Sequence, residues 1–452
     1  MQFETSDTEY EIQLNPEQQD AYDRFELFLN SDSTLFALLG AAGCGKSFTA
    51  SELFRLFNNY RDILWLAPTW KATRVAGRFL DEVGADYEIG YDSYMHAPGM
   101  MILTTTQQAL GIRPVIEDDQ TAHKINFAAG GGRTLMQRLR PEIIVIDEVS
   151  MLAKRHLEAI YKACAEIGCK ILIIGDPGQL PPVKEAEINW ARIPNKAELT
   201  TVMRQAGDSM IPILGGAIRR GETWRGITGK GINPVNRVTD AFIERVEVPT
   251  LDESQRTVFV AYRNAVVDSL QERACQKVYG HGRSDFQPGQ IVIAQSALYA
   301  FKQGMVIANQ DYLTVSDIGD QGEWGRECVV DLMNGRRVHT EYLSGEDLAN
   351  KRHPYNLRLE ELRNEAQKLQ AEWKETKSQS VDKMRREAWA KFFQHKDQTV
   401  LDFAHPFAIT SHKSQGSTYG DVFVDADDIE RFSNRGLYVA MTRPSGELFF
   451  NR

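Results

Sequence analysis

The sequence has no apolar run approaching the ~18 consecutive residues that a membrane-spanning helix needs. Its first residues, MQFETSDTEYEIQ, are acidic and polar, unlike a secretory signal peptide. The five cysteines form no C-x-x-C pair, so neither a zinc ribbon nor a disulfide framework is expected. We therefore expect a reduced, cytoplasmic protein without a membrane partner.

An excess of positive charge is also missing. The 52 basic and 62 acidic residues give a net charge of −10, which argues against blanket coating of duplex DNA but allows a local basic groove. The composition, 42% hydrophobic and 25% charged, is that of a globular protein. At roughly 150 residues per domain, the 452 residues predict three or four domains.

Short apolar runs, alternating at first with helical patterns, predict parallel sheets that are covered on both faces. Four runs belong to a first α/β core: 34–39, 63–67, 143–147 and 170–175. Three later runs belong to a second core: 257–261, 421–425 and 447–450.

Two insertions interrupt these cores. Residues 112–116 and 124–127, followed by the glycine-rich 130–133, predict a β-hairpin. Residues 285–400 begin with strand patterns of a small barrel, and a helical pattern follows over 357–394 with a break near Ser378. Between Lys351 and Val400, 12 basic against 8 acidic residues leave a charge of +4. This arm is either a solvated helical hairpin or a contact for nucleic acid or a partner.

Residues 40–47 (GAAGCGKS) match the phosphate-binding pattern G-x-x-x-x-G-K-[ST] between an apolar strand and a helical pattern. Gly43 and Gly45 let backbone N–H groups turn toward phosphate oxygens, and the helix N-terminus adds a partial positive charge. Lys46 is expected to bridge the β- and γ-phosphates, and Ser47 to ligate Mg²⁺. The pattern predicts an ATP site.

An acidic pair, Asp147 and Glu148, ends an apolar strand about 100 residues later. At the carboxyl end of a parallel strand both carboxylates can reach a nucleotide. Asp147 is expected to hold Mg²⁺, and Glu148 to orient and deprotonate the attacking water. Without the phosphate loop, such a pair is more often a solvated corner.

Further ordered motifs make the sequence resemble superfamily 1 helicases, and within them the RecD-like branch with the bacteriophage Dda helicases. The motifs are DEVS (147–150), GDPGQLPP (175–182), SHKSQG (411–416) and LYVAMTR (437–443), supported by LNPEQ (14–18), APTWKA (67–72), TVMRQ (201–205) and AYRNAVVD (261–268).

For the nucleotide, this resemblance implies that Gln18 reads the adenine edge and that Gln179 senses the γ-phosphate. Arg204 and Arg443 would be arginine fingers from the second core, each worth about 10³–10⁵ in rate. Their rival interpretation is a surface salt bridge. Gln415 and Gly416 would also face the γ-phosphate.

For DNA, the resemblance points to Thr69, Trp70, Thr410, His412 and Lys413. Trp70 could instead be a core aromatic residue.

Two further DNA contacts depend on insertions and alignment. Thr105 would lie in a Thr-x-His segment that here reads Thr-Thr-Gln, and an alternative alignment uses His96. Phe127, less favourably Ile125, would be the hairpin residue that separates strands, unless Phe127 packs against its own hairpin.

The resemblance implies two RecA-like domains, 1–90 with 140–195 (1A) and 196–284 with 401–452 (2A). The insertions are a pin at 91–139 (1B) and, at 285–400 (2B), a Src-homology-type barrel with a helical arm. It further implies a monomer that uses Mg²⁺ and ATP to move 5′→3′ on single-stranded DNA and to unwind forked DNA, with a single-strand-binding protein as a candidate partner. Rival functions are a translocase that displaces bound proteins, a non-motor recombination mediator and, more distantly, a small-molecule kinase.

Overall fold

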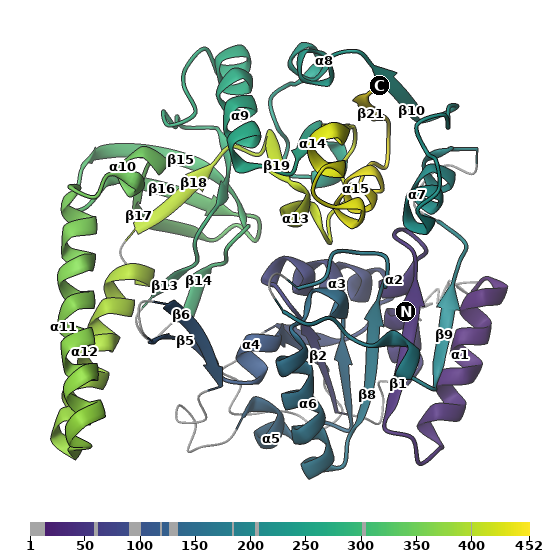
Figure 1. Ribbon diagram of the computed structural model, residues 1–452, viewed down its shortest axis with the longest axis horizontal. Coiled ribbons are helices and arrows are strands. Elements are labelled where there is room, and N and C mark those ends of the chain that lie inside the picture. The colour runs from purple at the N-terminus through teal and green to yellow at the C-terminus, as the bar shows by residue number, and fades with distance from the viewer. Residues whose placement is uncertain are drawn as a thin grey trace, which may run out of the picture. The chain divides into compact units, whose positions relative to one another are not determined.

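The computed structural model of the chain describes residues 14–57, 62–89, 101–117, 120–125, 134–182, 185–203, 208–300, 304–398 and 400–452. The chain divides into two compact units, Met1–Asp208 and Ser209–Arg452 (Figure 1). Within the described residues, no helix is long and apolar enough to cross a membrane.

The first unit is built on a parallel sheet, which confirms the expected α/β class. Its strands, in spatial order, are β3 (Tyr87–Ile89), β4 (Met101–Thr105), β2 (Ile63–Ala67), β7 (Ile143–Ile146), β8 (Lys170–Gly175), β1 (Leu35–Gly40) and β9 (Lys196–Leu199).

Helices cover both faces of this sheet. Successive residues of a strand point to opposite sides, and because both sets are apolar, each face has to be buried. In β1, Phe36 and Leu38 pack into one buried cluster, whereas Ala37 and Leu39 pack into the other. The first cluster is covered by α1 (Pro16–Leu29), α2 (Lys46–Phe57) and α3 (Trp70–Glu82). The second is covered by α4 (Thr106–Ala109), α5 (Leu135–Leu139) and α6 (Lys154–Ile167), with short 3₁₀ turns η3 (Val149–Met151) and η4 (Trp190–Arg192) nearby.

The expected hairpin inserts after α4. It consists of the antiparallel strands β5 (Ile112–Glu117) and β6 (Gln120–Ile125), in a register that pairs Ile112 with Ile125. Phe127, which we predicted on its second strand, lies outside the described residues.

The second unit contains a smaller sheet, again with every neighbouring pair parallel. Its spatial order is β10 (Ile232–Val235), β21 (Leu448–Asn451), β20 (Val422–Val424), β11 (Val258–Ala261) and β19 (Ala408–Thr410). On one face, α8 (Val238–Arg245) and α9 (Asn264–Tyr279) bury Phe259 and the stacked pair Phe423 and Phe449. The remaining helical segments are α7 (Ile211–Arg220), η5 (Glu253–Gln255), α13 (Ser411–Ser414), α14 (Ala426–Glu430) and α15 (Asn434–Met441).

The expected small barrel is confirmed as a closed five-stranded barrel inserted in the second unit. Its strands are β12 (Ile291–Ala294), β15 (Tyr312–Gln321), β16 (Arg326–Leu332), β17 (Arg337–Leu343) and β18 (Val400–Ala404), and the small hairpin β13 (Leu298–Ala300) and β14 (Gly304–Ile307) interrupts it.

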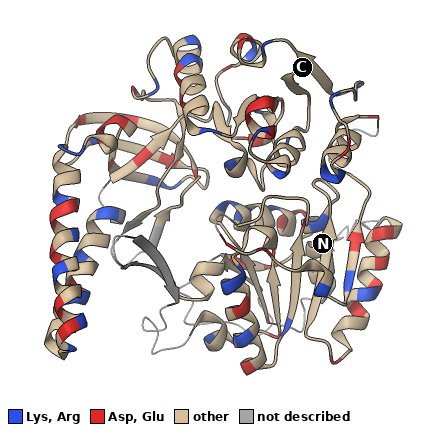
Figure 2. Cartoon of the chain, in the orientation of Figure 1, with Lys and Arg blue, Asp and Glu red and all other residues tan. Residues whose placement is uncertain are grey.

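The helical arm follows the barrel strand β17 through α10 (Gly345–Ala349). It is an antiparallel pair, α11 (Pro354–Thr376) and α12 (Gln379–Gln398), with the helix break where the sequence placed it. Figure 2 shows both signs of charge along α11. Several of the basic groups are paired within the arm, for example Arg385 with Asp382 at 2.5 Å and Arg386 with Asp382 at 2.7 Å.

Three details differ from our predictions. Strand β9 pairs with β1, so residues 196–199 belong to the first sheet and not to the second core. Strand β18 pairs with β17 and β12, so the barrel extends beyond residue 400. Cys164 and Cys169 form a disulfide with a Cα–Cα distance of 5.1 Å, because the turn after α6 brings them within bridging range. Sequence spacing alone did not reveal that turn.

The α1 cluster yields a stability prediction. Phe25 is fully buried against Phe28, Phe36 and Phe54. Phe25→Ala should lower the free energy of unfolding of the first unit by about 3–5 kcal/mol, since it deletes a ring and leaves a cavity. Leu27→Ala on the same helix, at a site that is 72% exposed, should change it by less than about 0.5 kcal/mol. Urea unfolding measures both, and similar losses for the two variants would contradict this packing.

Candidate functional site

The candidate site of the first unit lies along one edge of its sheet. Because all strands are parallel, the carboxyl ends of β4, β2, β7, β8 and β1 lie side by side. The segments that follow these ends contain, in the same order, Thr105, Thr69, Asp147, Gln179 and the phosphate loop. Ligands of open α/β sheets bind at this edge. The fold therefore gathers residues that lie far apart in the sequence.

The phosphate loop has the backbone that its glycines permit. Gly43 and Gly45 have φ angles of 80° and 79°, a left-handed region that disfavours other residues. Lys46 begins α2, and its Nζ donates to the carbonyl oxygens of Gly40 at 3.0 Å and Ala41 at 2.8 Å. Its ammonium group thus lies against the loop that would hold phosphates.

Ser47 and Asp147 are brought together across the site. The Ser47 hydroxyl donates to Asp147 Oδ2 at 3.1 Å, and Asp147 is only 4% exposed. A hydroxyl and a carboxylate suit Mg²⁺, which characteristically takes one or two protein ligands and fills its shell with phosphate and water oxygens. In the described parts of the chain, no group of three or more His, Cys, Asp or Glu residues could hold a metal ion alone. The pair fits an ion that arrives with a nucleotide.

Asp147 and Glu148 form an electrostatically strained pair. Burial raises the pKa of Asp147 to about 7, and repulsion from the Glu148 carboxylate adds to the shift. Glu148 adopts a left-handed backbone conformation (φ 47°), which is rare for a residue with a side chain. Its Oε2 is buried without a hydrogen-bond partner among the described residues. Such features are typical of functional sites.

Gln18 lies beside the phosphate loop, but its amide is already engaged. Its Oε1 accepts from Asn15 N at 3.0 Å in a capping box, and its Nε2 donates to Thr49 Oγ1 at 3.1 Å. Thr49 in turn donates to the carbonyl oxygen of Gly45 at 2.9 Å. Gln18 therefore connects the start of α1 to the loop. Its proposed contact with adenine remains a prediction.

The structure describes the position of Gln179 but not that of Arg204. Gln179 is 3% exposed, and its backbone N–H donates to Asp176 O at the end of β8. Arg204 lies outside the described residues. The preceding Met203 belongs to the first unit, where its N–H donates to Gly43 O of the phosphate loop at 2.7 Å. Residues 196–203, which we assigned to the second core, therefore belong to the first unit, because β9 extends the first sheet.

The predicted DNA contacts of the first unit occupy helix starts. Thr69 is exposed and caps α3 by accepting from Ala72 N at 3.1 Å, and Trp70, next to it, is half-buried. Thr105 is 5% exposed and caps α4, so its hydroxyl faces its own helix. The alternative residue His96 lies outside the described residues.

In the second unit, Thr410, His412 and Lys413 lie where β19 ends and α13 begins. Thr410 caps α13 by accepting from Lys413 N at 3.4 Å. Lys413 Nζ donates to Gln295 Oε1 of the barrel region at 2.6 Å, and burial lowers the pKa of Lys413. Burial also lowers the pKa of His412. The second sheet thus has a cation and a hydroxyl at the carboxyl end of β19.

Arg443 is buried inside its own unit. It is 1% exposed, and it donates from Nε to Val439 O at 2.8 Å and from Nη1 to Ser417 O at 3.1 Å. Ser417 follows Gln415, which is 7% exposed, and Gly416, whose φ is 76°. The structure therefore brings these three predicted nucleotide residues together. A surface salt bridge, the rival interpretation for Arg443, does not describe this environment.

Our sequence interpretation missed a group of polar residues around Lys413. Asn264, Gln271, Gln295, Asp402 and His405 line a cavity with it. Asn264 lies in the AYRN motif, which could have suggested a role. Gln271 lies further along α9, and Gln295, Asp402 and His405 come from barrel strands or the residues that follow them; no spacing marks these four.

Comparisons with known proteins agree with this geometry. Residues 13–229 match the family model described as an AAA domain, and residues 405–450 match the UvrD-like helicase C-terminal domain. An uncharacterized protein of Acanthamoeba polyphaga mimivirus is 23% identical, over 97% of this chain and 99% of its own length.

Among solved structures, the chain resembles Pif1 helicases. A structure concerned with DNA unwinding at forked duplex DNA by two coordinating Pif1 helicases has a TM-score of 0.55 at 16% identity, covering 98% of this chain and 92% of the other. The Pif1 helicase from Bacteroides in complex with ADP-AlF₃ and single-stranded DNA has a TM-score of 0.54 at 15% identity, with coverages of 98% and 93%. The chain therefore has the fold of these structures, with two RecA-like domains.

The raised pKa of Asp147 yields a prediction about pH. The folded protein holds a proton that an unfolded aspartate releases near pH 4, so the free energy of unfolding falls as pH rises from about 4 to 7. Asp147→Asn removes this effect. In the protein without nucleotide, the variant should gain more stability over the wild type at pH 8 than at pH 5.

Denaturant unfolding at the two pH values measures this gain. Asp32→Asn, at an exposed site of the same unit, is the control for removing a carboxylate. A gain at Asp147 that is equal at both pH values would show that its carboxyl group is not held protonated by burial.

Proposed function

We propose that this chain is a superfamily 1 DNA helicase that hydrolyses ATP to move on DNA. One observation carries the proposal: a phosphate loop, the bonded pair Ser47 and Asp147, and the predicted DNA contact Thr69 all follow strand ends along one sheet edge. A nucleotide and a DNA strand bound along this edge would share the same rigid strands.

The chemistry of the first unit supports ATP hydrolysis. Lys46 and the loop N–H groups would neutralise the phosphates, and Ser47 and Asp147 would hold Mg²⁺, which would supply further positive charge to the phosphates. The positive charge of the ion would stabilise the ionised form of Asp147 and so offset the effect of burial, which raises the pKa of this residue. Among the described residues, the buried Oε2 of Glu148 has no hydrogen-bond partner, as a group that receives a proton from water would need.

The likeness to Pif1 structures supports the DNA part. One of those proteins was solved with ADP-AlF₃ and single-stranded DNA, and another structure concerns forked duplex DNA. We extend these ligands to the present chain: ATP with Mg²⁺ as fuel, and single-stranded and forked DNA as substrates. Thr410, His412 and Lys413 would hold phosphates at the second sheet, as Thr69 and Trp70 would at the first.

Finer features come from the RecD-like resemblance alone. They are the 5′→3′ direction, action as a monomer, division into domains 1A, 1B, 2A and 2B, and use of the β5–β6 hairpin as the strand-separating pin. In this scheme Arg443 would be an arginine finger, and its hydrogen bond to Ser417 O would link it to the segment of Gln415 and Gly416. Melting one base-pair step costs about 1.4 kcal/mol, an amount that an aromatic stack on the pin could largely offset.

Removal of the phosphate-loop lysine tests the nucleotide site. Lys46→Ala should lower ATP hydrolysis stimulated by single-stranded DNA by about 10²-fold or more, because a preorganised positive charge at the phosphates is lost. Lys154→Ala, an exposed lysine of the same unit, is the matched control. Wild-type protein that binds DNA but shows no ATP hydrolysis would favour the non-motor recombination mediator.

Glu148→Gln separates binding from chemistry. The variant keeps the shape of the side chain but cannot accept a proton from water, so nucleotide affinity should be retained while turnover falls by about 10²-fold or more. Equilibrium binding of a fluorescent ATP analogue and steady-state hydrolysis measure the two properties. Near-normal turnover would remove Glu148 from the role of general base.

A further inference from the structure

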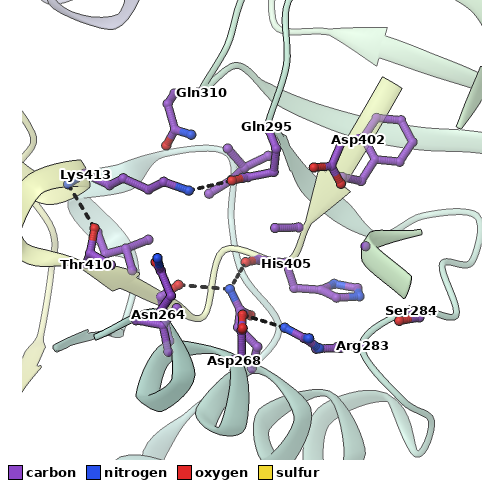
Figure 3. A pocket seen from close by; sticks show the side chains of 18 of the residues that line it. Asn264, Asp268, Arg283, Ser284, Gln295, Gln310, Asp402, His405, Thr410 and Lys413 are labelled. Atoms are coloured by element: carbon purple, nitrogen blue, oxygen red, sulfur yellow. Dashed lines mark hydrogen bonds and ion pairs between the residues drawn. The ribbon is translucent and has the colours of Figure 1, made fainter. Parts of the chain in front are cut away.

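A cavity of about 280 Å³ lies within the second unit, between the end of the second sheet and the barrel. Figure 3 shows Lys413 reaching across it to Gln295, with Asn264 and the Asp268–Arg283 pair below and Asp402 beyond. Thr410 and Lys413, the predicted phosphate contacts, form part of its wall. The cavity is therefore continuous with the proposed DNA surface.

Two buried side chains on this wall have unused hydrogen-bonding groups. His405 is 1% exposed, and neither ring nitrogen has a partner among the described residues. Gln271 is 5% exposed; its Nε2 donates to the backbone oxygens of His405 and Ala408, but its Oε1 accepts from nothing in the described chain. Unpaired buried polar groups cost about 1–3 kcal/mol each, so they call for an explanation such as a ligand.

The ring nitrogens of His405 and Oε1 of Gln271 would be satisfied by a ligand that has both hydrogen-bond donors and acceptors. Burial lowers the pKa of His405 to about 3, so its ring is neutral and offers one donor and one acceptor. Gln271 Oε1 needs a donor. Asp402, whose pKa burial raises to about 6, adds a further acceptor when ionised.

The charges on the wall oppose an anionic ligand. Arg283 is bonded to Asp268 at 2.6 Å, and the charge of Lys413 faces that of Asp402. The two cations and two carboxylates balance, so a phosphate enclosed in the cavity among all four would gain little. A neutral, polar ligand fits better.

Size and apolar wall area point to a flat ring. Phe286, Ile293 and Phe403 line the cavity beside the polar groups. Its volume lies just below the range of about 300–1,000 Å³ for sites of drug-sized ligands, and it exceeds the roughly 30 Å³ of a water molecule several-fold. A nucleobase combines a planar apolar face with an edge of donors and acceptors.

We propose that this cavity receives one nucleobase of the single strand whose phosphates contact Thr410 and Lys413. The inference rests on the proposed function, since it needs a bound strand, and deepens it by adding a base contact to phosphate contacts. The base would lie against Phe286 or Phe403 and present its edge to Gln271, Asp402 and His405. Such a pocket would hold the strand in discrete one-nucleotide positions on the second unit.

The test is an abasic scan. A short oligonucleotide that just fills the DNA site is made with one abasic nucleotide at each position in turn, and its affinity for the full chain is measured by fluorescence anisotropy. One position should lose about 5- to 150-fold in affinity, the range for loss of one base contact. Phosphate contacts are unchanged in every oligonucleotide of the scan.

Variants assign that position to the cavity. Ala404 lines the cavity and is half-buried, so Ala404→Leu should fill the space and abolish the position-specific loss. Ser284→Leu, at another half-buried lining position, should act alike and serves if the first variant does not fold. Ala349→Leu, at an exposed site outside the cavity, should retain the wild-type pattern.

Three results would overturn the proposal. The first is a flat scan of the wild type without binding of a free nucleoside, in which case water would serve the unpaired groups. The second is a loss that persists in both filled variants. The third is a flat scan together with binding of a free nucleoside that Ala404→Leu abolishes, since the base would then not be carried by a strand. A chain that binds no single-stranded DNA would instead overturn the proposed function.

Discussion

The hydrogen bond from Ser47 to Asp147 joins the two halves of the proposed nucleotide site. Ser47 is fixed by the start of α2, and Asp147 by the end of β7, so their distance of 3.1 Å depends on the order of β7, β8 and β1 in the sheet. Burial at this position raises the pKa of Asp147 and so disfavours its ionised form. A divalent ion with phosphates would favour the ionised carboxylate of Asp147, so the pair suits the ligand that is proposed to bind there.

The second unit repeats the first in outline and differs in chemistry. It too presents strand ends followed by short helices, but its described residues include no phosphate loop; its sheet edge carries Thr410, His412 and Lys413. Buried Arg443 donates hydrogen bonds to Ser417 O and to Val439 O of α15. A displacement of the segment around Gly416 would therefore also displace α15. The barrel reaches this edge through Gln295, which accepts from Lys413. The proposed DNA surface therefore combines sheet and barrel.

Much of the fold could be predicted because its strands are continuous apolar runs. Segments 63–67 and 170–175 match β2 and β8 residue for residue, since buried parallel strands need apolar side chains on both faces. The break between α11 and α12 also follows from local residues. Strand β9 (KAEL) is short and half polar at a sheet edge, so its pairing with β1 has no local signal.

Site residues were predictable only where a motif fixes their chemistry. The residue types and spacing of the phosphate loop and of the acidic pair indicate their chemistry directly, and the structure brings the two together. The engaged amide of Gln18 and the burial of Arg443 depend on tertiary neighbours that the sequence does not display. The cavity around His405 is built from α9, the barrel and β18, and no single segment contains enough of it to be recognised.

The proposed function requires one protein scaffold to couple a bound nucleotide to a bound DNA strand. Thermodynamic linkage requires such coupling to appear as a change in affinity. The most direct measurement is the dissociation constant for single-stranded DNA without nucleotide, with ADP, and with a non-hydrolysable ATP analogue, all with Mg²⁺. The account predicts that these constants differ by about 5-fold or more between nucleotide states. Identical constants in all three states would contradict it.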